Sequence, residues 1–590
     1  MNTKKSGNYQ GDIHNVAYRQ PYLEKAVTRR DMVADAGREM ESLDGEWNFF
    51  IDQYDTFLRA RWYQAPLKDA AGRSLPVDFD FDQWDRIRVP SCWNTQAPEY
   101  FYYEGTAVYT RTFEYHPRGE KHAVLKIGAA NYESFVFLNG QFVGCHRGGS
   151  TPAYFDITAQ LATDNRISIV VNDTRRQENV PAENTDWFNY GGIFRSVELL
   201  RLPEVFIRDF RLTLVPGSGF GKIRASVALS APAAVSGRLS VPELGVDRPF
   251  ETAGGKWEAE IDCSPELWSP DHPKLYDVRL TAGEDALTDR IGFREIRVEG
   301  LDVLLNGEKI YLKGISCHED SVSNGRAVTE DEIVENLRLA KELGCNYMRL
   351  AHYPHTEKVA RTADRLGLML WEEIPVYWAI DFENPDTLAD AKNQLEELIT
   401  RDCNRASVVI WSVGNENADT DARLHFMKTL AETAKAEDPT RLVSAACLVD
   451  IAANKIADRL ADFLDIIGIN EYYGWYNPNF ALLPECFANS RVTKPVVISE
   501  YGAGARAGCR GTSDDLFTED MQKAVYEKQV ATLGAIPVVR GMSPWILFDF
   551  RCPRRHNRYQ RGYNLKGLLS ADKKTKKLAF YVLQRFYATR

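Results

Sequence analysis

From about residue 298 the chain repeats one hydrophobic pattern, in which a short apolar run precedes an amphipathic stretch. Short apolar runs bounded by turn residues are typical of buried parallel strands, and apolar positions three or four residues apart are typical of helices. The pattern predicts a (β/α)8 TIM barrel over residues 298–590, with its active site at the carboxyl ends of the strands. The eight expected strands are Ile310–Ile315, Tyr347–Ala351, Leu368–Trp371, Val408–Val413, Leu442–Ala446, Ile466–Asn470, Val496–Ser499 and Ser543–Phe548.

One of the expected helices has explicit start and stop signals. Thr329 and Glu332 have the spacing of a capping box, and Gly344 provides the stop. Apolar residues recur between these signals at helical spacing, so we expect a helix whose inward face consists of Ile333, Leu337, Leu339 and Leu343.

Before residue 298 the polar and apolar positions alternate in short runs. Residues 1–203 contain many such runs, and the run Tyr132–Leu138 ends in an Asn139-Gly140 turn, which is typical of a β-hairpin. We therefore expect an antiparallel β-sandwich there. Residues 204–297 contain roughly seven shorter runs and predict a small immunoglobulin-like β-sandwich without a disulfide.

The bulk properties exclude some partners and leave the fold prediction unchanged. The chain has 590 residues and a formal net charge of −11, which argues against nucleic acid or an anionic membrane surface as a partner. Its ten scattered cysteines form no Cys-x-x-Cys pair and predict reduced, mostly buried thiols. The polar start Met1–Gly7 lacks a signal-peptide core, and no run of 18 apolar residues occurs. We therefore expect a cytoplasmic protein that does not bind membranes.

Two glutamates at the ends of predicted strands carry the candidate chemistry. Glu416 follows the run Val408–Asn415, and Glu500 follows the run Pro495–Ser499. Taken singly, a glutamate after a strand is most often a solvated loop residue. These two end the fourth and seventh strands, so their carboxyl groups can face one another across the barrel mouth. Such a pair predicts a retaining glycosidase, in which mutual repulsion raises the pKa of one glutamate and keeps it protonated as the acid.

Three neighbours of the glutamates fit a sugar site. Asn415 directly precedes Glu416 and can bond the sugar hydroxyl beside the anomeric carbon. Tyr472, at the tip of the sixth strand, can hold Glu500, and Trp545 offers a flat apolar wall for a sugar ring. Packing in the core or at the rim is the alternative for each of these side chains.

Neither a metal nor a cofactor is expected. His352 and His355 could be read as metal ligands, but no third ligand lies at a metal-site spacing and the spacing lacks His-Glu-x-x-His. The chain also has no glycine-rich cofactor-binding motif. The Arg-x-x-His-Tyr-Pro context of His352 favours a role in the sugar site instead.

Several motifs together resemble those of glycoside hydrolase family 2, and the likeness covers essentially the whole chain. They are Asn415-Glu416, Ser499-Glu500-Tyr501-Gly502, Gly148-Gly149-Ser150-Thr151-Pro152, Phe155-Asp156, Asn189–Arg195, Gly292-Phe293-Arg294, His318-Glu319-Asp320 and Arg349–Pro354. The resemblance implies that residues 1–203 are a jelly-roll sugar-binding domain and that the protein is a homodimer or homotetramer. It implies Glu416 as acid/base and Glu500 as nucleophile. It also implies that Asp156 and His352 bind sugar hydroxyls near C4.

Within that family, bacterial β-glucuronidases carry an Asn-x-Lys pair that binds the substrate carboxylate, and this chain has Asn564 and Lys566 at the corresponding place. A carboxylate needs a cation and directed donors, which Lys and an Asn amide supply. The family's further carboxylate-binding arginine is Gln560 here, and Arg561 or Arg558 is its expected substitute. The sequence therefore predicts a retaining exo-β-glucuronidase that acts on a carbohydrate or a glucuronide conjugate.

Other readings remain open at this point. Galacturonate, the C4 epimer of glucuronate, would satisfy the same cations. A β-galactosidase of the same family would leave Lys566 idle at the rim, and the basic residues near it would then form a solvated loop. A catalytically inactive carbohydrate-binding protein is the last alternative, and the intact glutamates argue against it.

Overall fold

The computed structural model describes residues 20–64, 71–73 and 79–590, and these form two compact units. The first unit contains the described residues up to Thr174 together with Asn189–Phe206. The second contains Arg175–Phe188 and Ile207–Arg590, so a short segment of the predicted 1–203 domain packs with the second unit. The stretch Met1–Gly7, on which the expected location rested in part, lies outside the described residues.

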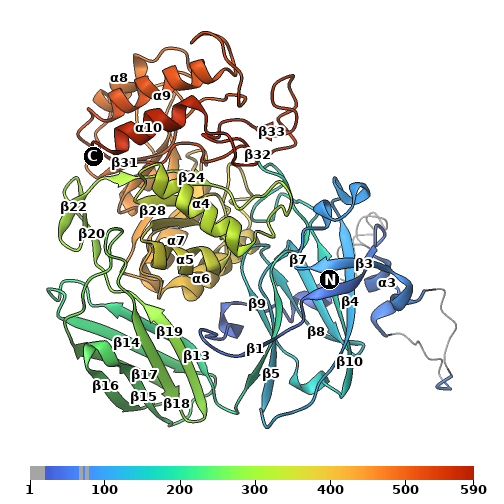
Figure 1. The fold of residues 1–590 in the computed structure, drawn as a ribbon. Helices are drawn as coiled ribbons and strands as arrows, with labels where there is room; N and C mark the ends of the chain where they lie inside the picture. Colours follow the sequence, from blue (N-terminus) through green and yellow to red (C-terminus); the bar gives the residue numbers. More distant parts are fainter. Residues whose placement is uncertain (1–19, 65–70, 74–78) are drawn as a thin grey trace, which may run out of the picture. The chain divides into compact units, whose positions relative to one another are not determined.

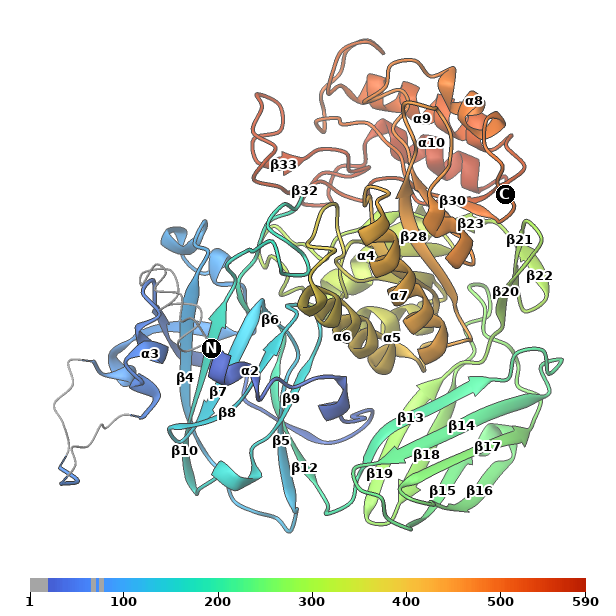
Figure 2. The ribbon, with the colours of Figure 1, turned by 180° about the vertical axis from the view of Figure 1, so that it is seen from behind.

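The first unit is a β-sandwich of two antiparallel sheets (Figure 1, Figure 2). Its core includes Trp47, Tyr109 and Leu199, all fully buried. One sheet has the strand order β1 (Met40–Ser42), β12 (Val197–Leu202), β5 (His122–Ile127) and β9 (Ala153–Asp156). The other has the order β3 (Asp85–Val89), β2 (Gly45–Ile51), β4 (Thr106–Glu114), β10 (Asp164–Asn172), β7 (Glu133–Leu138) and β8 (Gln141–Arg147). The pair β6 (Ala130–Asn131) and β11 (Gly192–Ile193) and the short helices α2 (Gln20–Leu23) and α3 (Thr56–Arg59) complete the unit.

The Asn139-Gly140 turn joins β7 to β8, which confirms the predicted hairpin. Asn139 and Gly140 have φ angles of 51° and 78°, as a two-residue hairpin turn of this hand requires. The Asn139 amide also donates to the Gln160 carbonyl at 2.9 Å and to the Asn165 side chain at 2.9 Å. The turn is therefore fixed by both its backbone and its side chain.

The second unit begins with a smaller sandwich of seven strands, in agreement with the roughly seven predicted. All ten cysteines of the chain are free thiols and eight of them are buried, so this immunoglobulin-like sandwich has no disulfide. Its sheets have the orders β13 (Ile207–Leu214), β14 (Lys222–Leu229), β17 (Lys256–Asp262) and β16 (Val246–Glu251), β15 (Ser236–Val241), β18 (Tyr276–Ala282), β19 (Asp285–Ile291). A small sheet of β20 (Ile296–Glu299), β21 (Asp302–Leu305) and β22 (Glu308–Ile310) leads into the barrel.

The barrel is a ring of parallel strands, and the predicted first strand is split into two pieces. β23 (Leu312–Lys313) pairs with the last strand and β24 (Ser316–Cys317) pairs with the second, which closes the ring. The remaining strands are β25 (Tyr347–Leu350), β26 (Met369–Glu373), β27 (Val408–Asn415), β28 (Leu442–Leu448), β29 (Ile467–Asn470), β30 (Val496–Glu500) and β31 (Val539–Met542).

The prediction for the eighth strand is wrong. The strand is β31, and the predicted segment Ser543–Phe548 follows it as irregular backbone. Pro544 lacks the N–H that a strand ladder needs, so the segment is apolar without being a strand. The glycine in β31 weakens its apolar pattern, but a Cβ on Gly541 would lie 2.5 Å from the Cβ of Leu312. Glycine there lets β23 approach and close the ring.

Helices cover the barrel strands, and α4 (Glu330–Glu342) begins at the predicted capping box. Thr329 Oγ1 accepts from the Glu332 N–H, and the Glu332 carboxylate accepts from the Thr329 N–H. Figure 1 and Figure 2 show α4 to α7 side by side against the strands. Among the described residues, none of the helices has the length and apolar content to cross a membrane. The other barrel helices are α5 (Glu357–Leu366), α6 (Pro385–Asp402), α7 (Asp421–Glu437), α8 (Leu482–Ala488), α9 (Glu519–Leu533) and α10 (Leu578–Tyr587), with the hairpin β32 (Phe550–Arg551) and β33 (Tyr563–Asn564) before α10.

Candidate active site

A cavity of about 430 Å³ opens at the carboxyl ends of the barrel strands. Its lining includes residues at or shortly after the ends of seven strands, β25 to β31, namely His352, Tyr377, Glu416, Leu448, Asn470, Glu500 and Trp545, with further lining from Asp186, Arg555 and Lys566. A larger cavity of about 640 Å³, lined by the immunoglobulin-like sandwich and barrel helices, contains none of the predicted site residues. The chemistry therefore belongs to the smaller cavity.

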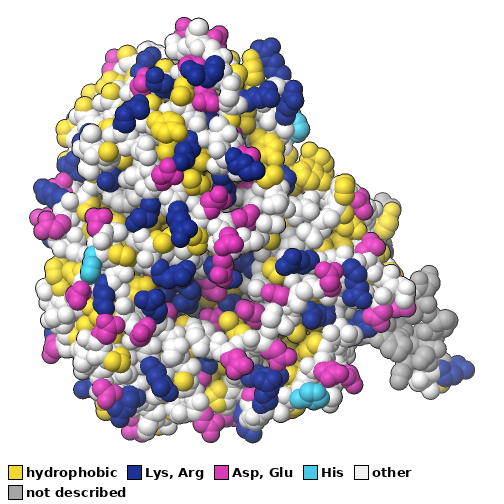
Figure 3. Space-filling model, viewed as in Figure 1, with side chains coloured by type: hydrophobic (Ala, Val, Ile, Leu, Met, Phe, Trp, Pro, Cys, Tyr) yellow, Lys and Arg dark blue, Asp and Glu magenta, His cyan; other side chains and the backbone are white. Residues whose placement is uncertain are grey.

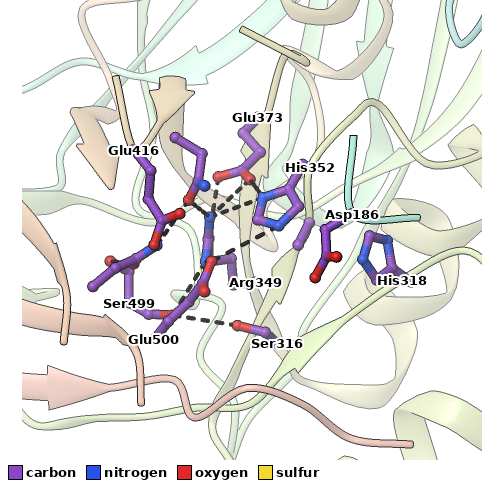
Figure 4. A network of polar contacts seen from close by, with 12 residues as sticks. Asp186, Ser316, His318, Arg349, His352, Glu373, Glu416, Ser499 and Glu500 are labelled. Carbon is purple, nitrogen blue, oxygen red and sulfur yellow. Dashed lines mark hydrogen bonds and ion pairs between the residues drawn. The ribbon is translucent and has the colours of Figure 1, made fainter. Parts of the chain in front are cut away.

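A buried arginine organises the floor of the site. Figure 4 shows Arg349, at the end of β25, between Glu373 and Glu500. Its guanidinium donates to Glu373 at 2.9 and 3.1 Å, to Glu500 Oε1 at 2.8 Å and to Asn415 Oδ1 at 2.8 Å. Burial alone would raise the pKa of Glu373, but the Arg349 charge and the bonds to it lower that pKa to about 2. Glu373 is thus a fixed anion that holds the arginine in place.

Glu416 sits directly after β27 with a left-handed backbone, at a φ of 53°. Its carboxyl accepts from Trp378 Nε1 at 2.7 Å and from Asn470 Nδ2 at 3.0 Å. Burial, and then the charge of Glu500, raises the pKa of Glu416 to about 7. A carboxyl group with that pKa can hold a proton near neutral pH and release it, as a general acid and base must.

Glu500, the last residue of β30, is held by different groups. Its Oε1 accepts from Arg349, and its Oε2 accepts from the Tyr472 hydroxyl at 2.7 Å. A cation therefore contacts Glu500, whereas neutral N–H groups contact Glu416. The two carboxyl groups line one cavity, and their different hydrogen-bond partners suit Glu416 to hold a proton and Glu500 to stay ionised.

At the other end of the cavity two cations meet at a tyrosine hydroxyl. Lys566 Nζ lies 2.8 Å from the Tyr476 oxygen, and an Arg555 nitrogen lies 3.5 Å from it. Burial would raise the pKa of Tyr476, but these two cations outweigh it and lower that pKa. Asp186 pairs with Arg555 at 2.5 and 2.9 Å and accepts from the Asn564 amide at 3.1 Å. Lys566 and Arg555 thus form a positively charged part of the cavity, which we call the positive corner, in a protein whose net charge is negative.

His352, Asn415 and Trp545 all lie at this site. His352 Nδ1 lies 2.7 Å from Glu373, and its ring stacks on Trp545 with centroids 4.8 Å apart. Asn415 accepts from Arg349 and Asn470 through its oxygen, while its Nδ2 is buried with no protein partner in the described structure. That amide has a free donor, which a bound hydroxyl could accept.

Four predicted residues are not among those that line the cavity. Asn415 and Asn564 contact the lining residues Asn470 and Asp186, whereas Asp156 and Arg561 do not. Asp156 ends β9 in the first unit, where its half-exposed carboxylate accepts from Thr158 and pairs with His122 at 3.1 Å. Arg561 is an exposed residue of the β32–β33 loop. Figure 3 shows Lys and Arg side chains gathered over this loop, whose exposed members include Arg554, Arg558 and Arg561. The sugar-binding roles of Asp156 and Arg561 stay predictions.

Asp186, Arg555 and Trp378 line the cavity and were not among the predicted site residues. Asp186 stands just before the quoted motif Asn189–Arg195, and Arg555 is one of several arginines in the basic loop. Trp378 comes five residues after the end of β26. Proximity to a motif was a usable signal for Asp186, whereas nothing in the chain singles out Arg555 among its neighbours.

Glu471 is a third glutamate on this cavity, at the position after β29. Its Oε2 accepts from the Tyr473 N–H at 2.9 Å and from Gln529 at 3.2 Å. Its Oε1 is buried without a hydrogen-bond partner among the described residues. Burial raises the pKa of Glu471 to about 8, so the group is mainly protonated at neutral pH.

Comparison with known proteins covers nearly the whole chain. Three models match it, which are described as the glycosyl hydrolases family 2 sugar binding domain over residues 40–203, glycosyl hydrolases family 2 over 205–294 and the glycosyl hydrolases family 2 TIM barrel domain over 296–589. A β-glucuronidase of Paenibacillus borealis is 30% identical and covers 93% of this chain and 97% of its own. A β-glucuronidase of Ruminococcus gnavus in complex with a C6-substituted uronic isofagomine has a TM-score of 0.82 at 25% identity, covering 95% and 100% of the two chains. A β-galacturonidase of Eisenbergiella tayi bound to galacturonate has a TM-score of 0.80 at 25% identity, covering 94% and 98%.

Proposed function

Because the chain belongs to glycoside hydrolase family 2, we propose that this glycosidase is a retaining exo-enzyme that releases terminal β-D-glucuronic acid. One observation carries the choice of sugar: Lys566 and Arg555 converge on the Tyr476 hydroxyl in the same cavity as Glu416 and Glu500. A uronic acid is the sugar that needs both a positive corner and a carboxyl pair.

The reaction proceeds by double displacement. Glu500 attacks the anomeric carbon as the C–O bond to the leaving group breaks, and Glu416 gives its proton to the departing oxygen. This yields a glycosyl ester on Glu500 and a free alcohol or phenol. Glu416, now a carboxylate, takes a proton from water, whose oxygen attacks the anomeric carbon and releases Glu500. The raised pKa of Glu416 suits both steps.

The remaining contacts position the sugar. The free Nδ2 of Asn415 is suited to donate to the hydroxyl beside the anomeric carbon. The Trp545 ring, stacked on His352, supplies a flat wall for the sugar ring. Arg349 and Tyr472 fix the orientation of the Glu500 carboxylate before attack.

The substrate carboxylate binds at the positive corner. Lys566 carries a charge surrounded by the rings of Tyr472, Trp475 and Tyr476, at 5.3, 6.0 and 4.8 Å from their centroids. Lys566 itself is only 4% exposed. Charge-assisted bonds from Lys566 and Arg555 to a carboxylate would therefore be stronger than at an exposed site.

A β-galacturonidase is the second candidate. The galacturonate-bound structure of the E. tayi enzyme, matched over 94% of this chain, favours it. Glucuronate and galacturonate differ only at C4, so Lys566 and Arg555 serve either sugar.

A substrate panel tests the proposal and separates the candidates. We expect the catalytic efficiency to fall in the order nitrophenyl β-D-glucuronide, β-D-galacturonide and β-D-galactoside. Lys566→Ala should lower the efficiency for the uronides by about 10²-fold, the loss typical of a charge-assisted contact, with little change for the galactoside. Arg510→Ala removes an exposed arginine that pairs with Asp520 and does not line the cavity, so it is the control and should leave all three efficiencies unchanged.

The panel also identifies the alternatives. An equal loss for neutral and acidic substrates in Lys566→Ala would refute the uronate site and favour a β-galactosidase. A galacturonide hydrolysed faster than the glucuronide would establish the second candidate. No turnover of any substrate by the wild-type protein would point to an inactive carbohydrate-binding scaffold.

A further inference from the structure

Near the carboxyl end the chain has a run of lysines, Lys573-Lys574-Thr575-Lys576-Lys577, and such a charge run is normally solvated. Lys574 is exposed, but Lys577, at the start of α10, is fully buried. Its ammonium pairs at 2.7 Å with the carboxylate of Asp549, which is buried as well. Neither residue is among those that line the active-site cavity. The contacts of this buried pair nevertheless lead to the cavity.

Lys577 connects two segments that carry site residues. Besides pairing with the aspartate, its ammonium donates to the Ala505 carbonyl at 2.6 Å and to the Leu565 carbonyl at 3.2 Å. Each of its three hydrogens therefore has an acceptor. Ala505 lies five residues after Glu500, and Leu565 directly precedes Lys566. The ammonium thus joins the loop that follows the candidate nucleophile to the turn that carries the lysine of the positive corner.

The aspartate holds the same turn on the other side of Lys566. Asp549 Oδ1 accepts from the Gly567 N–H at 2.9 Å. A Cβ on Gly567 would lie 2.6 Å from that oxygen and 2.2 Å from the Asp549 nitrogen, so glycine is needed for this approach. The fully buried Gln522 donates to the Gly567 carbonyl at 3.1 Å. The backbone on each side of Lys566 is therefore bonded to a buried polar side chain.

Stability alone does not account for a buried lysine and aspartate. Removing two charges from water costs free energy that their attraction roughly offsets, and an apolar pair of the same size often stabilises a fold at least as well. An apolar pair has no directed bonds, however, whereas the ammonium and the carboxylate fix backbone groups at defined distances. A pyranose that binds Glu500 at C1 and Lys566 at its C6 carboxylate needs these two side chains at a constant separation.

We propose that the Lys577–Asp549 pair positions Lys566 relative to Glu500 and thereby determines the preference of the site for a uronic acid over a neutral sugar. The inference rests on the proposed function, because it assigns the residues that place the carboxylate-binding lysine of that reaction. Lys577 and Asp549 are positioning residues and do not touch the sugar. A neutral hexose makes no charge-assisted bond to Lys566, so its hydrolysis depends little on where that ammonium lies.

The test measures the ratio of the catalytic efficiencies on nitrophenyl β-D-glucuronide and nitrophenyl β-D-galactoside. Lys577→Met combined with Asp549→Asn leaves no buried charge unpaired, and the asparagine oxygen can still accept from the Gly567 N–H. We expect this double variant to lower the ratio by about tenfold, because a small displacement of Lys566 weakens a directed, charge-assisted bond. The loss should appear in KM for the glucuronide, with its kcat and the galactoside efficiency nearly unchanged.

Two further variants control for charge and for folding. Lys574→Met removes an exposed lysine of the same run, one that does not line the cavity, and should keep the wild-type ratio. Gln522→Met removes the donor to the Gly567 carbonyl without changing any charge, and should lower the ratio by about threefold. The thermal midpoint of each variant shows whether it folds, and Gln522→Met tests the same turn if the double variant does not.

Combination with Lys566→Ala separates positioning from a general loosening of the barrel. If the pair acts through Lys566, the Lys577→Met and Asp549→Asn changes should lower the ratio no further once residue 566 is alanine. A further fall in that background, an unchanged ratio in the folded variants, or an equal loss on both substrates would overturn the positioning role. Failure of the proposed function looks different, since Lys566→Ala alone would then leave the ratio at its wild-type value.

Discussion

Buried after β27, Glu416 accepts hydrogen bonds from the neutral N–H groups of Trp378 and Asn470, whereas Glu500 is bound by the Arg349 guanidinium. The same side chain type thus meets two electrostatic environments within one cavity. The pKa of about 7 for Glu416 follows from burial and from the neighbouring carboxylate. At the residue scale, this difference makes the division into acid and nucleophile testable.

Glu416→Gln should lower the catalytic efficiency on phenyl β-D-glucuronide by about 10²- to 10⁴-fold, because the leaving phenol then departs without a proton. In the wild-type protein the rate should fall as the pH rises through about 7, where Glu416 loses its proton. The variant should lose this basic limb. A pH–rate profile of both proteins measures the effect.

Trp378→Phe is the matched control, since it keeps the carboxyl group and removes a donor that lowers its pKa. Its basic limb should move to higher pH. An unchanged limb in Glu416→Gln would assign the titration to another group.

Glu471 should make the stability of the protein depend on pH. Its pKa is about 8 in the folded protein against 4.5 for an ordinary glutamate, so the folded state binds a proton that the unfolded state has released. Its contribution to stability is therefore fully present below about pH 4.5 and is lost as the pH rises toward 8. Glu471→Gln cannot ionise and should be more stable than the wild type at pH 8, by a few kcal/mol, with a smaller difference at pH 5.

Thermal midpoints at pH 5 and pH 8 measure this difference. Glu485→Gln, which changes an exposed carboxyl group on α8, is the control and should show no such trend. Equal differences at the two pH values would mean that Glu471 is ionised in the folded protein.

Glu416 and Glu500 could be found from the sequence, because each directly follows a β-branched run that predicts a strand. Asp186 and Arg555 could not be found in this way, since their contact joins positions 369 residues apart. The basic loop offered Arg558 and Arg561 as substitutes for the missing family arginine, but Arg555 is the one that reaches the cavity. Only tertiary structure distinguishes equivalent arginines in one loop.

At the scale of elements, periodicity predicted the strands that have an uninterrupted apolar run. It misplaced the eighth strand because β31 contains Gly541, which the approach of Leu312 requires, while the following segment is apolar but contains Pro544. The Thr329 capping box fixed the start of α4 because its bonds are local. Sequence signals thus succeed where the determining contacts lie within one element.

A buried ion-pair network joins the immunoglobulin-like sandwich to the barrel, and its removal should lower the free energy of unfolding. Arg405, which precedes β27, pairs with Asp289 of β19 and with Asp364 of α5 at 3.3 Å, and all three side chains are about 95% buried or more. Arg405→Ala leaves buried carboxylates without this cation and should destabilise the second unit by about 3–5 kcal/mol.

Arg459→Ala removes an exposed arginine that pairs with Asp419 and Asp421 and should leave the unfolding midpoint nearly unchanged. Denaturant unfolding followed by tryptophan fluorescence compares the two variants, because Trp268 packs at the same junction. Similar midpoints for both would show that the buried network contributes little.

At the scale of the whole molecule, the two units divide the chain differently from the three predicted domains. Arg175–Phe188 leaves the first unit to pack with the barrel unit, and it carries Asp186 and Trp187 to the active site. Trp187 lies 5.7 Å from His352 between ring centroids. A segment that lies between two strands of the sandwich in the sequence thus packs with the barrel unit and lines its cavity, which no boundary drawn from composition could reveal.

Asp186, which lines the cavity, and Asp156, which the resemblance assigns to the sugar, can be compared by substitution. Asp186→Asn keeps the size of the side chain but removes the charge that holds Arg555 in two hydrogen bonds. It should lower the catalytic efficiency on phenyl β-D-glucuronide by about 10²-fold, because the positive corner loses its fixed geometry. Asp156→Asn is the matched comparison, since the resemblance to the family assigns the sugar contact to Asp156. A large loss in Asp156→Asn with little change in Asp186→Asn would support the role that the resemblance gives to Asp156, and would contradict the role of Asp186 in holding Arg555.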